Sequence, residues 1–190
     1  MEEEAELYLN GTLSDDGKTP LVYWKYRGRE GVISLEQARK QAKELFTAAS
    51  VAQSEGALLK AFQKLDAAGK GKGFGKSPRS QLPIFVLKLA REERPPISDN
   101  LQVIFGHNTQ IGLVDVGAAW YGERIQLSVE EAYQHASQLI EAAEVSESDA
   151  FFYWFLQSKI NCSLEEAYVL IQEFAVFRAT NRLEELFKRS

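Results

Sequence analysis

Several residue types that mark specialised classes of protein are scarce in this sequence. The 190-residue chain has one cysteine, Cys162, and two histidines. A lone cysteine cannot form an intramolecular disulfide or supply a cysteine-based zinc site, which excludes a secreted disulfide scaffold and a zinc finger. No uncharged apolar run of about 18 residues is present, and the first ten residues are acidic where a signal peptide would be basic. We therefore expect a cytoplasmic protein that does not span a membrane.

The rest of the composition is that of a folded protein. Hydrophobic residues make up 45% of the chain and charged residues 26%, which excludes a disordered or collagen-like chain. A single core at this length buries about 70% of the surface that the unfolded chain exposes, so stability requires no metal. We expect neither a metal site nor a cofactor.

The clearest feature that is present is an internal repeat with an offset of 94 residues. Residues 34–65 and 128–159 align without a gap and are identical at ten of 32 positions. Upstream, in the same register, Gly28 aligns with Gly122. Self-similarity at a fixed spacing indicates a repeated structural unit, so the sequence predicts an internal duplication.

Each copy has the pattern of a β-hairpin followed by a long helix. Residues 21–26 and 111–121 are rich in β-branched and aromatic residues, and each run leads through a glycine turn into a second short strand. Residues 7–9 and 101–105 predict an additional strand before each hairpin. The expected fold class is α+β, with two ββα units and a C-terminal helix.

Capping boxes predict where three helices begin, at Ser34, Ser128 and Ser163. In this motif the serine oxygen accepts a hydrogen bond from the first turn, and a Gln or Glu three residues later reaches back. The last helix is expected to run to about residue 187. A stripe of mostly alanine, at residues 38–59 and again at 132–153, indicates close packing against another backbone. The pattern leaves open whether the two long helices are unbroken or kinked.

These elements divide the chain into four predicted segments. Residues 1–66 form the first ββα unit, residues 97–160 the second and residues 161–190 the C-terminal helix. Residues 67–96 form a glycine-rich connector that contains one apolar, strand-like stretch. Its basic side chains outnumber its acidic ones by seven to two within residues 67–94, whereas the whole chain has a net charge of −5.

The basic connector is the candidate site for nucleic-acid binding. Glycine N–H groups and basic side chains can together form a lining that binds phosphate. The candidate residues are Lys70, Lys72, Lys76, Arg79, Lys88, Arg91 and Arg94. A P-loop is excluded because the glycine-lysine pattern is one residue short and Pro78 follows it. A solubilising linker is the alternative interpretation of the same charges.

An aromatic cluster in the second long helix is the candidate site for partner binding. Residues 151–156 have the sequence FFYWFL, and a helix that is apolar all round is either buried on every side or in contact with a partner. The candidate partner-binding residues are Phe151, Phe152, Trp154 and Phe155. The sequence leaves open whether the C-terminal helix buries them instead.

No pattern typical of catalysis is present. His107 and His135 belong to no recognisable acid, base or ligand spacing, and Cys162 has the usual features of a small apolar filler. We therefore expect a non-catalytic protein-protein interaction or adaptor protein, or a subunit of a larger assembly, which binds a protein partner or itself. A nucleic-acid-binding protein is the alternative. An enzyme is the third class, because catalytic sites can be assembled from residues whose spacing is uninformative.

Overall fold

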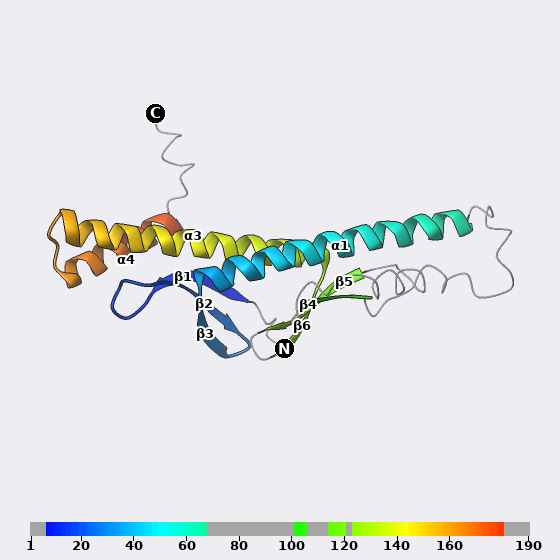
Figure 1. Ribbon diagram of the computed structural model, residues 1–190, viewed down its shortest axis with the longest axis horizontal. Helices are drawn as coiled ribbons and strands as arrows, with labels where there is room; N and C mark the ends of the chain where they lie inside the picture. The colour runs from blue at the N-terminus through cyan, green and yellow to red at the C-terminus, as the bar shows by residue number, and fades with distance from the viewer. Residues whose placement is uncertain (1–6, 68–100, 106–113, 121–122, 181–190) are drawn as a thin grey trace, which may run out of the picture. The chain divides into compact units, whose positions relative to one another are not determined.

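The fold is given by a computed structural model, which describes residues 7–67, 101–105, 114–120 and 123–180. Three strands precede a long helix, and three further strands precede a second long helix and a shorter one (Figure 1). The predicted mixture of strands and helices is confirmed.

The first sheet is an antiparallel meander of β1 (Tyr8–Leu13), β2 (Pro20–Tyr26) and β3 (Arg29–Ser34), in that order. Only two residues connect β2 to β3, Arg27 at φ 47° and Gly28 at φ 73°. Two successive positive φ angles define a type I′ turn, whose twist matches that of the strands and which favours glycine. The predicted glycine turn is therefore a tight hairpin.

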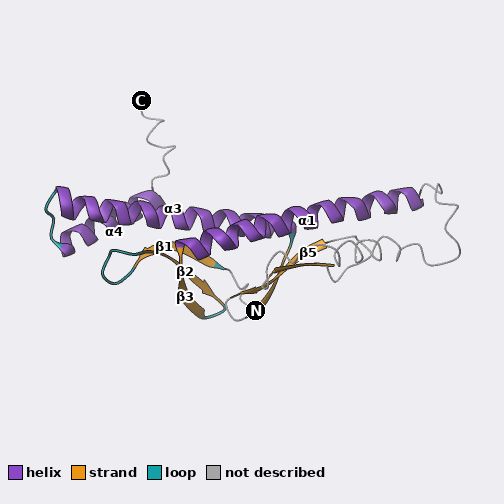
Figure 2. Ribbon diagram, viewed as in Figure 1, coloured by secondary structure: helices purple, strands orange, loops and turns teal. Residues whose placement is uncertain are grey.

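The second sheet repeats this order with β4 (Leu101–Phe105), β5 (Val114–Trp120) and β6 (Glu123–Leu127), all antiparallel (Figure 2). The middle strand of each sheet carries a fully buried valine, Val22 in β2 and Val116 in β5. The additional strand predicted before each hairpin is therefore present in both sheets.

The two sheets also share a strand register. Val22 pairs with Ile33 in the first sheet and Val116 with Leu127 in the second, which is the same pairing shifted by 94 residues. The residues of β1 and β4 that occupy equivalent positions in this pairing are 92 residues apart in the sequence instead of 94. The reason is that the connection from β4 to β5 is two residues longer than that from β1 to β2.

The helices are α1 (Leu35–Ala67), α3 (Val129–Lys159) and α4 (Leu164–Thr180). All three capping boxes are confirmed, with reciprocal hydrogen bonds of 2.7 to 3.2 Å between each serine and the Gln or Glu three residues on. Both long helices are continuous. The predicted end of the last helix near residue 187 and the strand-like stretch of the connector lie outside the described residues.

The predicted alanine stripes lie in the core. Their fully buried members are Ala38, Ala42, Leu45, Ala49 and Ala52 in α1, and Ala132, Ala136, Leu139, Ala143 and Ser146 in α3. Because these side chains are small, other backbones approach the helices closely. A Cβ atom added to Gly11 in β1 would lie only 2.7 Å from the Ala142 carbonyl oxygen of α3.

The described residues fall into two compact units. One comprises residues 1–39 and 139–190, so that it holds the first sheet, the second half of α3 and α4. The other comprises residues 40–138, which include most of α1 and the second sheet; within it, Tyr133 of α3 donates a hydrogen bond to Gln53 of α1. The boundaries of the four sequence-predicted segments stay predictions.

Candidate interaction surface

Three of the four predicted partner-binding residues are exposed on α3. Phe151 is 63% exposed, Trp154 51% and Phe155 37%. Their spacing of three and four residues places them on one face of the helix, and the Phe151 ring lies 5.8 Å from the ring of Trp154 and 6.5 Å from that of Phe155. Tyr153, which points the other way, is buried.

Phe152 differs from the other three because α4 packs against it. Its ring stacks on Phe174 of α4 with 5.6 Å between the centroids, and it contacts the small core formed by Tyr153, Leu156, Ala167 and Ile171. The sequence left open whether the C-terminal helix buries the whole cluster; in the structure it partly buries Phe152.

The turn between α3 and α4 is closed by backbone hydrogen bonding. Asn161 adopts the left-handed conformation at φ 59°, and the N–H of Cys162 donates to the Leu156 carbonyl oxygen at 3.1 Å. This hydrogen bond, together with the left-handed residue before Cys162, ends α3 and reverses the chain. Ser163 then caps α4, which runs back along α3 (Figure 1).

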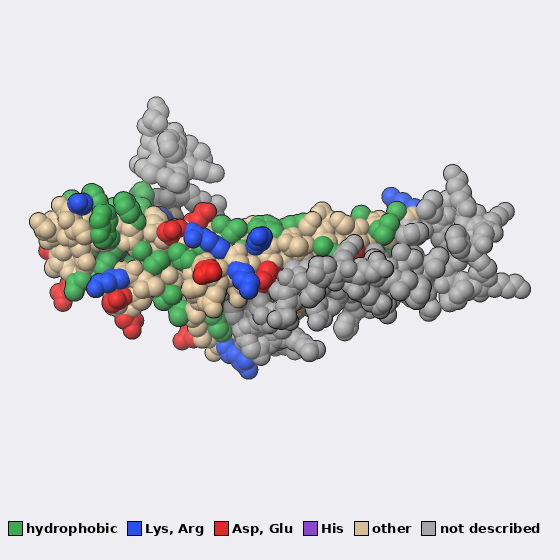
Figure 3. Space-filling model, in the orientation of Figure 1, with side chains coloured by type: hydrophobic (Ala, Val, Ile, Leu, Met, Phe, Trp, Pro, Cys, Tyr) green, Lys and Arg blue, Asp and Glu red, His purple; other side chains and the backbone are tan. Residues whose placement is uncertain are grey.

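Helix α4 is apolar on more sides than α3 covers. Ala167 and Ile171 are buried, whereas large apolar side chains on its other sides are exposed. We use the term α3–α4 apolar face for the exposed apolar residues near this turn, which are Phe151, Trp154, Phe155, Ile160, Leu164, Tyr168, Val169 and Leu170. Hydrophobic side chains gather at this end of the visible surface (Figure 3).

Part of this face is hollowed into an open groove of about 740 Å³ beside the turn. Its lining residues are Ile160, Asn161, Cys162, Glu165, Glu166, Val169, Leu170 and Glu173. The charged members are all glutamates. The pKa of Glu166 is lowered because its carboxylate accepts hydrogen bonds from the backbone N–H and the hydroxyl of Ser163, so Glu166 stays ionised at neutral pH.

The helical hairpin that carries the groove is strongly acidic. Residues 139–180 contain two basic side chains, Lys159 and Arg178, against the seven acidic residues Glu141, Glu144, Glu147, Asp149, Glu165, Glu166 and Glu173. Both basic groups already have neighbours. Lys159 Nζ lies 5.8 Å from the Trp154 ring, and Arg178 Nη2 lies 2.7 Å from Asp149 Oδ2.

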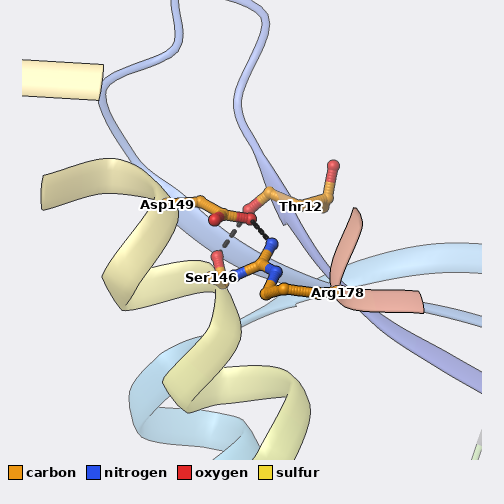
Figure 4. Close-up of polar contacts among 4 residues, drawn as sticks. All are labelled: Thr12, Ser146, Asp149 and Arg178. Atoms are coloured by element: carbon orange, nitrogen blue, oxygen red, sulfur yellow. Dashed lines mark hydrogen bonds and ion pairs between the residues drawn. The ribbon is translucent and has the colours of Figure 1, made fainter. Parts of the chain in front are cut away.

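A polar cluster holds this hairpin in place against the first sheet (Figure 4). Ser146 Oγ donates to the Thr12 carbonyl oxygen of β1 at 2.6 Å, and one turn further along α3 the buried Asp149 accepts from Arg178 of α4. The Arg178 guanidinium also lies 4.9 Å from the Phe174 ring. One face of α3 is therefore hydrogen-bonded both to β1 and to α4.

The seven basic residues proposed for nucleic-acid binding and His107 lie outside the described residues. Burial lowers the pKa of His135 to about 4, so that the imidazole is neutral at pH 7. Within the described ranges, no cluster of three or more His, Cys, Asp or Glu side chains is arranged to hold a metal ion.

The residues of this surface that the sequence did not single out include Val169, Leu170 and Glu173 of α4. A usable signal was present, because ten of the 14 residues from 164 to 177 are apolar, which is more than one buried face of a helix requires. The sequence left open whether this helix covers the aromatic cluster; it partly covers Phe152 and adds exposed apolar surface of its own.

Comparisons with protein-family models, with curated proteins and with solved structures found no match to the chain. None of the helices in the described part is both long and apolar enough to cross a membrane.

Proposed function

We propose that this chain is a non-catalytic protein-protein interaction or adaptor protein of the cytoplasm, and that the α3–α4 apolar face is its binding surface. The observation that supports the proposal is the exposure of Phe151 and Trp154, at 63% and 51%. Large exposed apolar patches on monomeric proteins mark interaction sites, and aromatic side chains dominate the binding energy of interfaces.

The neighbouring packing supports the same proposal. The aromatic residues lie on a continuous helix that is capped at both ends and fixed by the partly buried Asp149–Arg178 pair. A surface whose backbone is already rigid loses little conformational freedom on binding. The face therefore presents ordered aromatic anchors to a partner.

We further propose that the chain arose by duplication of one module of three strands and a helix. The ten identities between residues 34–65 and 128–159 support this, as does the strand pairing that recurs at a shift of 94. In this proposal, the first copy has alanine and leucine where the second acquired phenylalanine and tyrosine, since residues 57–59 read ALL and residues 151–153 read FFY. Partner binding belongs to the second copy.

The test uses the purified full chain, measured by size-exclusion chromatography with light scattering and by affinity capture followed by identification of retained proteins. We expect self-association or a retained partner, and loss of binding by at least tenfold in the variant Phe151→Ser/Trp154→Ser. Tyr8→Ser is the matched control, because Tyr8 is an aromatic residue 54% exposed on β1, outside the face. A strict monomer that retains no partner would contradict the proposal.

A further inference from the structure

The groove beside the α3–α4 turn combines an aliphatic floor with a row of negative charge. Ile160, Val169 and Leu170 are 56%, 53% and 41% exposed. Glu165, Val169 and Glu173 follow one another at intervals of four residues, so they lie in one row along α4. The two glutamates are separated by about 12 Å along the helix axis, at 1.5 Å per residue.

No basic side chain of the hairpin neutralises this row. Among the described residues, neither Glu165 nor Glu173 forms an ion pair. The two basic side chains of the hairpin are occupied elsewhere, since Arg178 pairs with Asp149 and Lys159 lies over Trp154. A partner that brings positive charge therefore gains electrostatic attraction without breaking an existing pair.

We propose that the groove binds a basic amphipathic helix of a partner protein, with Lys or Arg residues eight positions apart facing Glu165 and Glu173 and aliphatic residues between them facing Val169 and Leu170. A helix fits because its own rows of side chains at intervals of four have the same spacing as the row on α4. An apolar helix face docked in a groove is a common mode of peptide recognition. The inference rests on the proposed function and names the chemistry of its partner.

A second copy of the chain fits the groove less well. Pairing of two copies about a two-fold axis places the same surface against itself, so that Glu165, Glu166 and Glu173 of one copy would lie against the same acidic surface of the other. Like charges brought together across an interface are repulsive and act against the wrong partner. The charge of the groove therefore favours a partner of opposite sign over self-association.

The test measures fluorescence anisotropy of a labelled synthetic peptide of about 18 residues, long enough to form a helix. The probe has leucines at helical spacing and lysines eight positions apart, and a matched peptide replaces each lysine by glutamate. We expect the lysine peptide to bind the full chain at least about tenfold more tightly, and to weaken as salt is raised. The variant Glu165→Gln/Glu173→Gln should lose about fivefold in affinity, as two partly exposed ion pairs are removed.

A charge-matched control separates local from overall electrostatics. Glu141→Gln/Glu144→Gln removes the same charge from exposed positions of α3 that lie about 24 Å along the helix from the turn, and it should leave binding unchanged. Equal binding of the two peptides, or equal loss in both variants, would overturn the inference.

The failures of the two proposals are distinguishable. The chain could retain a protein partner or self-associate through Phe151 and Trp154, yet bind neither peptide. That result would contradict the basic-helix inference but not the proposed function. A monomeric chain that retains no protein partner and binds neither peptide would contradict both proposals.

Discussion

The substitution Gly11→Ala tests how closely β1 is packed on α3. A Cβ atom on residue 11 would lie 2.7 Å from the Ala142 carbonyl oxygen, 2.7 Å from the Ser146 backbone nitrogen and 3.0 Å from Cγ1 of Val145. Two of these contacts are with helix backbone, which cannot turn aside as a side chain can. The strand must therefore move away from the helix by roughly 0.7 Å to reach ordinary contact distance.

The cost of that movement can be worked out from its parts. Overpacking of this kind costs about 1–3 kcal/mol. The bond from Ser146 Oγ to the Thr12 carbonyl, at 2.6 Å, would stretch beyond the usual range and lose about 1 kcal/mol. Replacing glycine restricts the unfolded chain and returns about 0.5–1 kcal/mol. The net loss in the free energy of unfolding is about 2 kcal/mol, or about 4–8 °C in the midpoint of thermal unfolding.

Urea unfolding followed by tryptophan fluorescence measures this loss, because Trp24 and Trp154 both belong to the compact unit that contains Gly11. Ser146→Ala, which removes only the hydrogen bond, should cost about 1 kcal/mol by itself. Combined with Gly11→Ala it should add much less, since the strand shift has already broken the bond. A Gly11→Ala protein as stable as the wild type would show that β1 does not lie against α3 in this way.

Three further predictions concern stability. His135 is buried and its pKa is lowered to about 4, so the unfolded chain binds the proton more readily than the folded chain. The free energy of unfolding, measured by urea titration at each pH, should therefore fall as the pH drops from 6.5 towards 4, by about 2 kcal/mol at pH 5. His135→Gln should remove that part of the pH dependence. Arg178→Met should cost about 3 kcal/mol in the same assay by leaving the buried Asp149 carboxylate unpaired, and adding Asp149→Asn should restore most of it. Gly28→Ala should lower stability by about 1 kcal/mol in thermal unfolding, because residue 28 has φ +73°, whereas Gly28→Asn should cost less.

Features determined by neighbouring residues were predictable from the sequence. The capping boxes at Ser34, Ser128 and Ser163 formed as expected because each involves groups only three residues apart. The glycine turn at Gly28 is also local. The alanine stripes were predictable for a related reason, since a regular spacing of small residues along a helix marks a single buried face.

Features that depend on distant contacts were not predictable. Nothing near Gly11 in the sequence indicates that it faces Ala142 and Ser146, more than 130 residues away. The sequence also could not tell that Phe151 is exposed and that Phe152 is partly buried. Both residues are phenylalanine, and which of them is covered depends on the side from which α4 returns along α3. A stretch that is apolar all round carries no pattern that tells its buried side from its exposed one.

The acidic character of the α3–α4 hairpin accounts for how so much apolar surface can remain exposed. Leu164, Tyr168 and Val169 are each more than half exposed, and such a surface by itself favours association with any other apolar surface, including its own copy. Placing Glu165, Glu166 and Glu173 among these residues makes contact between two copies repulsive, in the way that charges on an exposed strand edge prevent unwanted pairing. The same charges attract a basic partner. The glutamates around the aliphatic groove therefore act against contact between two copies of the chain and in favour of contact with a basic partner. The charges supply the specificity, because the apolar part of the surface discriminates little between partners.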